Sequence, residues 1–408
     1  MAAMNDWLIS VDDHVIEPGH LWTSRLSAAD QEAGPHLVEM EDGVKSWKYE
    51  DKIMHTRGLW AAAGKKREDF SPKPISYEDM REGCYEPHAR VADMNEDGVL
   101  ASLCFPSFPR FCGQTFLEAR DKDLALRCVR AWNDFILDEW SAAAPGRFIP
   151  MIILPLWDPI LAVAEIERTS AKGAKAIAFS ENPAKLGLPS IHSAAGYWNP
   201  VFAAAEQAKM PICTHIGSSS SMPSTSADAP TVQHTATASV NLMLCTADWI
   251  FSGMFDRYPG LKLVLSEGGI GWIPYILDRF DDVVEKQKYW AAKAHLTRED
   301  VIAGKGEEAG VELPAHWDYS RLPSEIFRSN IYGCFIDEKF GVKVIDEIGV
   351  DNVMIETDYP HTDSTWPNSQ AIAAERLKNL SQEERFKVIQ GNAMRVFNFT
   401  PAAVPTVD

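Results

Sequence analysis

Eight short apolar runs, each separated from the next by segments of another character, constrain the fold of this 408-residue chain most strongly. The runs are continuous rather than alternating, which is typical of parallel strands that are covered on both faces. They lie at 7–11, 99–105, 148–154, 174–179, 210–214, 261–265, 330–335 and 352–355. Eight strands alternating with helices indicate a closed barrel or a large doubly wound sheet. Because no Gly-x-Gly-x-x-Gly follows the first run, the sequence favours an α/β fold of the (β/α)8 TIM-like barrel type.

The segments between the runs predict the remaining elements. Apolar residues at helical spacing indicate helices at 117–144, 160–170, 198–209, 275–290 and 340–348, and a Ser-x-x-Glu capping box at 381–384 opens the last helix. An Asp-Gly turn at 42–43 predicts a β-hairpin inserted after the first strand. We expect one barrel domain over residues 1–400, with an insertion at about 36–75, and a C-terminal tail at 401–408. The Ser/Thr/Pro-rich segment 217–235 is either a flexible linker or a mobile lid over the active site.

The charge and the cysteines limit the partners and the compartment that we expect. The formal net charge is −19, which argues against a nucleic-acid partner but not against a small anionic substrate. The N-terminal residues do not resemble a signal peptide, and no run reaches the ~20 apolar residues of a membrane span. The 7 cysteines show no paired spacing, so we interpret them as reduced core residues of a cytoplasmic protein.

Polar residues follow four of the predicted strands and indicate a metal site. Asp12 and His14 end the first strand two residues apart, so both side chains point to the same side. His215 ends the fifth strand and Asp358 follows the eighth. Each residue alone has a simpler interpretation, such as a turn cap or a core histidine, but in a barrel the carboxyl ends of strands carry the chemistry. The set therefore predicts a divalent metal, zinc most readily, with manganese or iron as alternatives.

These residues lie in motifs that resemble the amidohydrolase superfamily. The similarity is to its amidohydrolase-related branch, which includes aminocarboxymuconate-semialdehyde decarboxylase and γ-resorcylate decarboxylase. The matching stretches are ISVDDHVIEP, RVADMNEDGVLASLCFPS, WNPVFAAAEQAKMPICTHIG, MFDRYPGLKLVLSEGGIGWIPYILDR and NVMIETDYPHTDSTWP. The resemblance implies a (β/α)8 barrel, a homodimer and a single metal held by the four residues above. A single metal is favoured because the fourth strand ends in Ala-Phe-Ser, without the bridging lysine of binuclear relatives.

One departure from the branch bears on the reaction. Its decarboxylases carry a histidine before the Gly-Gly pair that follows strand six, and this chain carries Glu267 there. A carboxylate can accept a proton from a metal-bound water, so Glu267 is our candidate base, with a ligand role as the alternative. Asp358 is a second candidate for moving the proton, and His234 and His361 are candidate helpers or, equally, structural loop residues.

The remaining candidates concern the substrate. Four aromatic residues near strand ends predict a roomy apolar pocket for a bulky or aromatic small molecule, unless they are core anchors: Trp22, Phe105, Trp272 and Trp366. Arg57, with Lys65, Lys66 and Arg67, forms a cationic tract for a carboxylate or phosphate group, or simply a solvated face. We therefore predict a metal-dependent hydrolase that cleaves an amide, ester, thioester or activated C–C bond. The alternatives are a non-oxidative decarboxylase of an aromatic or unsaturated acid, and a metal-free barrel that acts as a binding protein.

Overall fold

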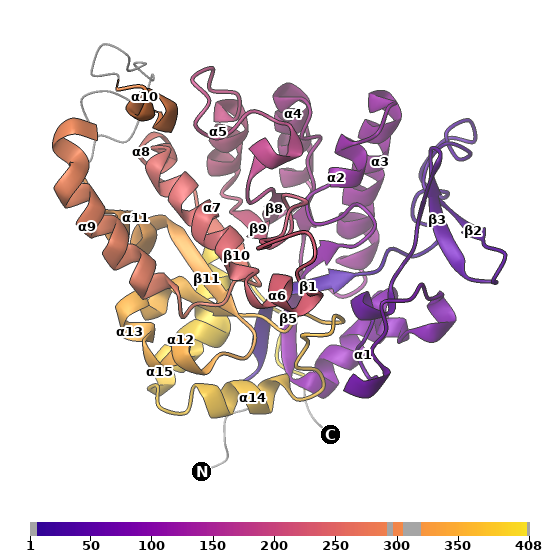
Figure 1. The fold of residues 1–408 in the computed structure, drawn as a ribbon. Helices are drawn as coiled ribbons and strands as arrows, with labels where there is room; N and C mark the ends of the chain where they lie inside the picture. Colours follow the sequence, from indigo (N-terminus) through magenta and orange to yellow (C-terminus); the bar gives the residue numbers. More distant parts are fainter. Residues whose placement is uncertain (1–5, 292–296, 305–319, 406–408) are drawn as a thin grey trace.

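The computed structural model describes residues 6–291, 297–304 and 320–405, and two parallel sheets lie at its centre (Figure 1). One sheet has the order β1-β5-β6 and the other β12-β11-β10-β9-β8-β7. Every pairing in these two sheets is parallel, which confirms the α/β class. The strands are β1 (Leu8–Val15), β5 (Val99–Pro106), β6 (Phe148–Ile149), β7 (Met151–Ile152), β8 (Ala176–Phe179), β9 (Ile212–His215), β10 (Leu263–Ser266), β11 (Ile331–Phe335) and β12 (Val353–Ile355).

The two sheets adjoin each other at both of their edges. On one side β6 and β7 follow one another in the chain with only Pro150 between them. On the other side the segment after β12 runs beside β1: Asp358 N donates to Asp12 O at 2.9 Å, and His14 N donates to Tyr359 O at 2.7 Å. These contacts bring residues that are about 350 positions apart in the chain to the same edge.

Helices surround the strands (Figure 1), and most of the predicted ones are present. The predicted 117–144 helix is divided, because Asp121 caps a new helix by accepting a hydrogen bond from Leu124 N at 2.9 Å. The Ser381 capping box is confirmed. The helices are α1 (Pro87–Asp97), α2 (Gln114–Leu117), α3 (Lys122–Phe135), α4 (Pro159–Ser170), α5 (Asn199–Ala208), α6 (Thr231–Ala236), α7 (Ser239–Phe251), α8 (Met254–Arg257), α9 (Ile273–Ala291), α10 (Arg298–Ile302), α11 (Pro323–Asn330), α12 (Lys339–Lys343), α13 (Ile345–Ile348), α14 (Ser369–Arg376), α15 (Gln382–Phe386) and α16 (Asn392–Val396).

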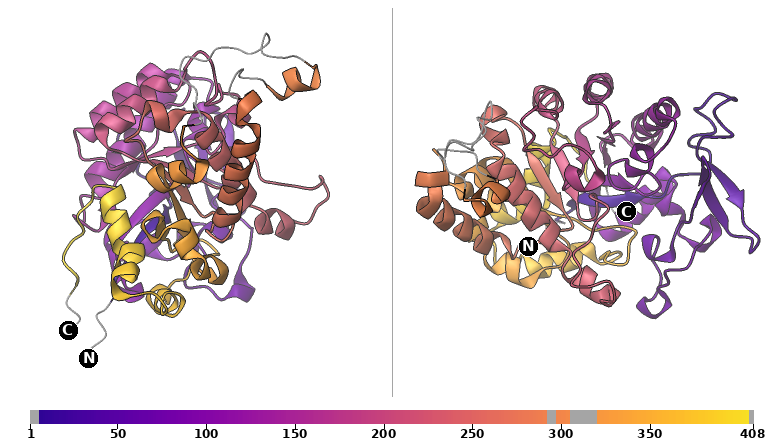
Figure 2. Two further views of the ribbon diagram at one scale, coloured as in Figure 1. Left: turned by 90° about the vertical axis from the view of Figure 1, so that its left-hand side faces the viewer. Right: turned by 45° about the horizontal axis from the view of Figure 1, so that its top comes forward.

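A small antiparallel sheet, here named the arm sheet, projects from one side of the molecule (Figures 1 and 2). It consists of β2 (His36–Glu39), β3 (Lys45–Tyr49) and β4 (Lys52–Met54). The Asp42-Gly43 turn joins its first two strands, and Gly43 has a φ of 82°, which glycine adopts without strain. Trp47 of β3 is 2% exposed and meets Trp22 edge-on with ring centroids 5.1 Å apart, so the arm sheet is packed onto the body.

Three further observations bear on the sequence predictions. Within the described residues, no helix combines the length and the apolar character needed to cross a membrane. All seven cysteines are buried and free, as a role in the core requires. The predicted tail at 401–408 has no regular structure over 401–405, and its last three residues lie outside the described ranges.

Candidate metal centre and its cleft

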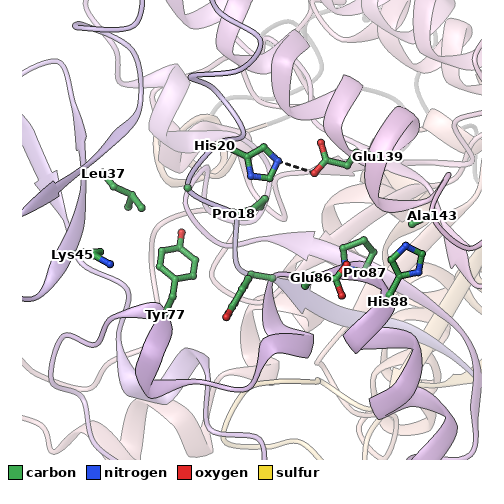
Figure 3. Close-up of a pocket in the computed structure, with 12 residues that line it drawn as sticks. Pro18, His20, Leu37, Lys45, Tyr77, Glu86, Pro87, His88, Glu139 and Ala143 are labelled. Atoms are coloured by element: carbon green, nitrogen blue, oxygen red, sulfur yellow. Dashed lines mark hydrogen bonds and ion pairs between the residues drawn. The ribbon is translucent and has the colours of Figure 1, made fainter.

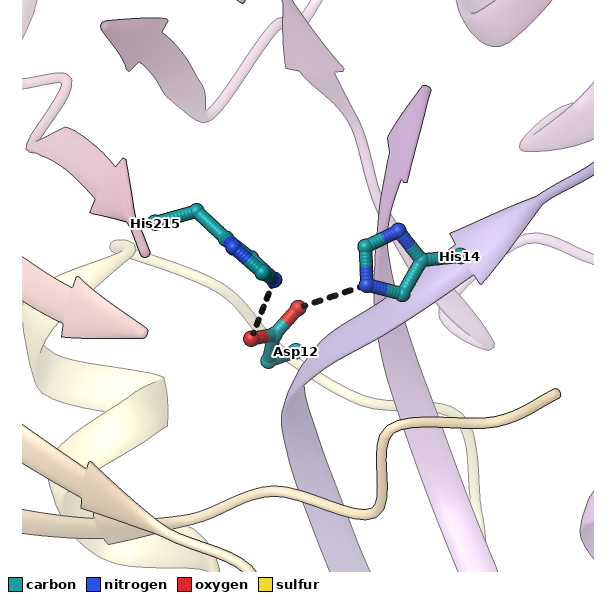
Figure 4. Close-up of side chains that lie close together, drawn as sticks. All are labelled: Asp12, His14 and His215. Atoms are coloured by element: carbon teal, nitrogen blue, oxygen red, sulfur yellow. Dashed lines mark ion pairs between the residues drawn. The ribbon is translucent and has the colours of Figure 1, made fainter. Parts of the chain in front are cut away.

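Four of the sequence-predicted residues converge at the carboxyl ends of the strands, and we name them the metal-ligand cluster. Asp12 and His14 lie on β1, His215 ends β9 and Asp358 follows β12. His14 Nε2 is 3.6 Å from Asp12 Oδ1 and 3.3 Å from Asp358 Oδ1. His215 Nε2 is 3.3 Å from Asp12 Oδ2 (Figure 4). Because these side chains are at most 1% exposed, they form a closed set of nitrogen and oxygen donors.

The atoms that face the centre of this cluster fit a cation. The carboxylate oxygens of Asp12 and Asp358 and Nε2 of both histidines are buried without a hydrogen-bond partner in the described part of the chain. Buried polar atoms are nearly always partnered, so such a group of orphans requires an explanation. His215 Nδ1 lies 2.7 Å from the Ile216 carbonyl oxygen. Donation to that carbonyl leaves the Nε2 lone pair free, which is the arrangement that a metal-binding imidazole needs.

Burial and neighbouring charges change the pKa values of the side chains in the cluster. Burial, and then the charges of Asp358 and Asp13, raise the pKa of Asp12 well above its usual value. Burial also lowers the pKa of His14, which keeps its imidazole neutral and able to bind a metal. For Asp358 burial acts against ionisation, but His361 and His14 outweigh it and hold its pKa below the usual range. Without a cation, this concentration of carboxylates is therefore costly.

Aromatic rings hold the two histidines in place. The His361 ring stacks on His14 with centroids 3.7 Å apart, and its Nδ1 is 3.0 Å from Asp358 Oδ1. The Phe111 ring stacks on His215 at 4.2 Å, and Phe105 meets that imidazole edge-on at 5.0 Å. The structure thus brings His361 and Phe105 to the cluster. Phe111 was missed, because its loop position follows no strand periodicity.

Glu267 reaches the cluster from the end of β10. Its Oε2 lies 3.3 Å from His215 Nε2, and its side chain is 19% exposed. Its φ is 60°, and its backbone N–H donates to both carboxylate oxygens of Glu356 at 3.1 Å. Burial, followed by the charge of Asp358, raises the pKa of Glu267. Glu356, which follows β12, therefore holds the backbone from which Glu267 reaches His215.

A second buried carboxylate supports the segment behind His215. Glu181 follows β8, and its Oε1 accepts hydrogen bonds from Gly217 N at 3.1 Å, Ser219 Oγ at 2.6 Å and Asn241 Nδ2 at 2.8 Å. Asn241 Nδ2 also donates to Ser221 O at 2.6 Å. Glu181 therefore fixes the start of the 217–235 segment to α7. No sequence pattern indicated this role, because it depends on contacts across three separate stretches of chain.

A cleft in two halves opens beside the cluster. The tryptophan half, of about 410 Å³, is lined by Glu267, Glu356 and Trp272. The cationic half, of about 440 Å³, is lined by Lys65, Arg67, His361 and Trp366 among others. Three lining residues are common to both halves: Ile336, Asp337 and Asp363. The two cavities are thus neighbouring parts of one cleft at the carboxyl ends of the strands.

Three predicted site residues belong neither to the cluster and its aromatic surround nor to the lining of this cleft. Trp22 is fully buried, and its Nε1 donates to the Cys128 carbonyl at 3.1 Å. Arg57 is exposed, and its Nη1 donates to the Pro72 carbonyl at 3.3 Å. His234 lies on α6, where the neighbouring Thr235, rather than His234 itself, lines the tryptophan half.

A separate crevice of about 550 Å³ lies between the arm sheet and α1 (Figure 3). It is lined by Leu37 and Lys45 of the arm sheet, together with Tyr77, Pro87 and other residues of the body. On its wall, His20 Nε2 pairs with Glu139 Oε1 at 2.8 Å. The crevice shares no lining residue with either half of the cleft, so it is not part of the candidate site.

Curated relatives correct the reaction that we expected from Glu267. The chain is 26% identical over 327 residues to the γ-resorcylate decarboxylase of Polaromonas sp. strain JS666, covering 76% of this chain and 86% of that enzyme. It is also 26% identical over 303 residues to the γ-resorcylate decarboxylase of Rhizobium sp. strain MTP-10005, covering 69% and 79% respectively. The prediction of a hydrolase is therefore wrong. A carboxylate before the Gly-Gly pair was insufficient evidence against decarboxylation.

Solved structures show the fold, and a family profile shows the family. An amidohydrolase from Mycobacterium avium subsp. paratuberculosis K-10 superposes with a TM-score of 0.70 at 20% identity, covering 97% of this chain and 100% of that one. A dihydroxybenzoic acid decarboxylase from Polaromonas sp. JS666, solved with bound manganese and 2-nitroresorcinol, gives 0.56 at 19% identity, covering 98% and 99%. These likenesses show a common fold. The amidohydrolase family profile matches residues 19–399, nearly the whole chain, and the protein therefore belongs to the amidohydrolase family.

Proposed function

We propose that this protein is a metal-dependent non-oxidative decarboxylase of small aromatic carboxylic acids. The observation that carries the proposal is the buried cluster of two carboxylates and two imidazoles with unpartnered donor atoms. Ligand atoms lie within 4.8 Å of one another in two overlapping groups that share His14: Asp12, His14 and His215, and His14, Asp358 and His361. The names of the curated relatives support the reaction type, and the manganese in the Polaromonas structure supports a divalent metal. We expect manganese rather than the zinc predicted from the sequence, because the two carboxylates supply the oxygen ligands that manganese accepts readily.

The side chains around the cluster have distinct tasks in this proposal. When bound by Asp12, His14, His215 and Asp358, a divalent cation supplies positive charge that anchors and polarises oxygen atoms of the substrate. Phe111 and Phe105 place apolar rings against the His215 imidazole, and apolar surroundings suit an aromatic substrate. The aromatic carboxylate loses carbon dioxide, and a proton replaces it on the ring carbon. Glu267 lines the cleft and reaches His215, so we assign this proton to its carboxyl group.

The same proposal extends to the architecture. We propose that the two parallel sheets form one closed eight-stranded barrel, with β6 and β7 as parts of a single strand. The contacts of β1 with the segment after β12 support this closure. Residues 1–400 then form one domain, and the arm sheet belongs to an insertion at about 36–75. The homodimer and the cytoplasmic location stay predictions from the sequence.

The test is a decarboxylation assay on the metal-reconstituted protein. Protein stripped with a chelator is reloaded with manganese, zinc or iron, and the bound metal is measured by elemental analysis. Hydroxybenzoic acids, including 2,6-dihydroxybenzoate, are then supplied in deuterium oxide. We expect release of carbon dioxide and one deuterium at the carbon that carried the carboxylate. Loss of substrate without carbon dioxide, or no turnover by protein with full metal content, would contradict the proposal.

Glu267→Gln separates two roles for that residue. If Glu267 carries the proton, the variant keeps its metal and loses decarboxylation by about a hundredfold or more. Loss of metal from Glu267→Gln would instead make the residue a ligand. Asp358→Asn serves as the reference for a variant that loses metal and activity together.

A further inference from the structure

A cavity of about 380 Å³, here named the basic cavity, lies at the amino-terminal ends of β9 and β10. Three cationic residues line it: Lys209 follows α5, Lys262 immediately precedes β10, and Arg395 lies on α16. The metal-ligand cluster lies at the opposite ends of these strands, so about 10 Å of strand separates the two places. The basic cavity shares no lining residue with the cleft and has no part in the candidate site.

The three cations have no acidic partner in the part of the chain that the structure describes. None of them makes an ion pair there, although the chain carries 58 acidic and 39 basic residues. The Arg395 guanidinium donates to neutral acceptors instead, namely Tyr332 Oη at 3.1 Å, the Asp351 carbonyl at 2.6 Å and Asn392 Oδ1 at 3.1 Å. These bonds use only part of its donors, so the rest are available to a ligand. Unpaired cations gathered in so acidic a chain indicate an anionic ligand.

The positive charges in the basic cavity also oppose one another. Burial, and then the charge of Arg395, lower the pKa of Lys262. The Lys262 ammonium donates to the Arg395 carbonyl at 3.4 Å, which supplies no negative charge. Glu206 is the single carboxylate among the lining residues, and its Oε1 accepts a hydrogen bond from Gly260 N at 2.6 Å. A bound anion would therefore lower the free energy of both cations.

The backbone around the basic cavity is fixed before any ligand binds. Lys209 has a φ of 55°, at the end of a helix where glycine is the usual residue. Met210 N donates to the Ala205 carbonyl at 3.0 Å, and Ile212 N donates to the Lys262 carbonyl at 2.9 Å. The segments that carry the two lysines are thus held by the fold, which reduces the entropy lost when a ligand binds between them.

We propose that the basic cavity binds a phosphate group, either as inorganic phosphate or as the phosphate of a small organic monoester. A phosphomonoester carries a charge of about −1.5 to −2 at pH 7, and three cations less the charge of Glu206 offer a charge of that size and opposite sign. Lysine ammonium groups and arginine N–H groups are strong donors to phosphate oxygens. Because the cavity lies far from the metal-ligand cluster, the bound phosphate stabilises the fold and takes no part in decarboxylation.

The experiment measures binding and stability together on manganese-loaded protein from which unbound metal has been removed. The probes are inorganic phosphate, ribose 5-phosphate and uncharged ribose, each followed by calorimetry and thermal unfolding, with sodium chloride at equal ionic strength as the blank. Lys262→Met removes one charge and keeps an apolar stem. Lys209→Gly removes another and suits the φ of 55°. Lys175→Met is the matched control, because Lys175 is half-buried and immediately precedes β8 but does not line the cavity.

We expect the wild type to bind phosphate or ribose 5-phosphate with a dissociation constant below about 1 mM, and not to bind ribose. Its Tm should rise by about 3 °C at 100 times that constant. Lys262→Met and Lys209→Gly should each weaken binding by about tenfold or more, whereas the control binds as the wild type does. Without ligand, Lys262→Met should unfold at a higher temperature than the wild type, because it removes a partly buried charge beside Arg395.

The two sources of the phosphate group are distinguished by the same measurements. Tighter binding of ribose 5-phosphate indicates an organic monoester, and equal binding of the two indicates inorganic phosphate. The inference is overturned if neither compound binds or raises the Tm beyond the chloride blank. Binding that persists unchanged in both lysine variants lies elsewhere, for example at the bound manganese, and overturns it as well. Equal weakening in Lys175→Met would show a general effect of net charge and have the same consequence.

Discussion

Asp12→Asn should change the stability of the metal-free and metal-loaded protein in opposite directions. Asp12 is fully buried, and both of its carboxylate oxygens lack partners in the described structure. Asparagine keeps the shape and removes the charge. Its amide would lie where Oδ2 is now, 3.3 Å from the unpartnered His215 Nε2, and could donate to it. We therefore expect metal-free Asp12→Asn to be more stable than the metal-free wild type, by about 1–2 kcal/mol.

With metal bound, the wild type should be more stable than Asp12→Asn. A ligand present at about 100 times its dissociation constant stabilises the native state by about 2.7 kcal/mol. With about 2.1 cal/mol/K of unfolding entropy per residue, the 408 residues give roughly 0.86 kcal/mol/K, so the wild type should gain about 3 °C in Tm. Asp12→Asn loses a negatively charged ligand and should show little or none of this shift. Manganese titration followed by thermal unfolding measures both effects.

Asp13→Asn provides the matched control on the same strand. Asp13 is equally buried, but its oxygens accept hydrogen bonds from Thr357 Oγ1 at 2.6 Å and from Tyr359 N at 3.0 Å, among others, and its charge faces Arg90. We expect Asp13→Asn to keep the rise in Tm on manganese binding. The variant should be less stable than the wild type, because the Asp13 carboxylate already has hydrogen-bond partners that the substitution disturbs. The reasoning would be refuted if Asp12→Asn kept the full manganese shift, or if its metal-free form were less stable than the wild type by more than about 1 kcal/mol.

Three further predictions concern Glu17 and two residues that contact His215 or the segment after it. Glu17 follows β1 by two residues, and its buried carboxyl accepts hydrogen bonds from Ser107 N at 3.0 Å and Phe108 N at 2.8 Å. Burial raises the pKa of Glu17 to about 7, so the folded state binds its proton more tightly than the unfolded chain does. Relative to Glu17→Gln, the wild type should therefore lose up to about 3 kcal/mol of unfolding free energy as the pH rises from 4.5 to 7.5. Urea denaturation measures this loss, and a difference between the two proteins that does not change with pH would contradict the prediction. Phe111→Ala should weaken manganese binding by about tenfold, because the stacked ring orients His215, and unchanged affinity in calorimetry would show that the ring is dispensable. Glu181→Ala should make the 217–235 segment more sensitive to limited proteolysis, whereas Glu181→Gln should not, since Oε1 makes the hydrogen bonds and Oε2 has no described partner.

The sequence predicted the elements and the cluster where local rules decide them. The eight apolar runs correspond to the observed parallel strands, because strands that are buried on both faces must be apolar throughout. Asp12 and His14 could be paired in advance because side chains two apart on a strand share a side. His215 and Asp358 could be added because parallel strands end at the same edge.

The rest depends on contacts that no local rule contains. Glu356 holds the backbone of Glu267, which has a φ of 60°, although it follows β12 and Glu267 follows β10, with β11 between the two strands. Phe111 reaches His215 from a loop whose course follows no strand or helix period. Trp22 was expected near the cleft, but its ring packs against Trp47 of the arm sheet instead. A sequence pattern reports which residues end a strand, and it does not report how the following loop turns.

The failure of the hydrolase prediction has a physical reason as well. Glu267 was interpreted as an isolated base at a strand end, where a carboxylate would be ionised and unable to donate a proton. In the fold, burial first and then the charge of Asp358 raise the pKa of Glu267, so its carboxyl group holds a proton more tightly than an exposed carboxylate does. A protonated carboxyl can do what the imidazole of related enzymes would do, which is to deliver a proton to carbon. The same residue type therefore supports opposite chemistry depending on the charges around it, and those charges are brought together by strands that are distant in the sequence.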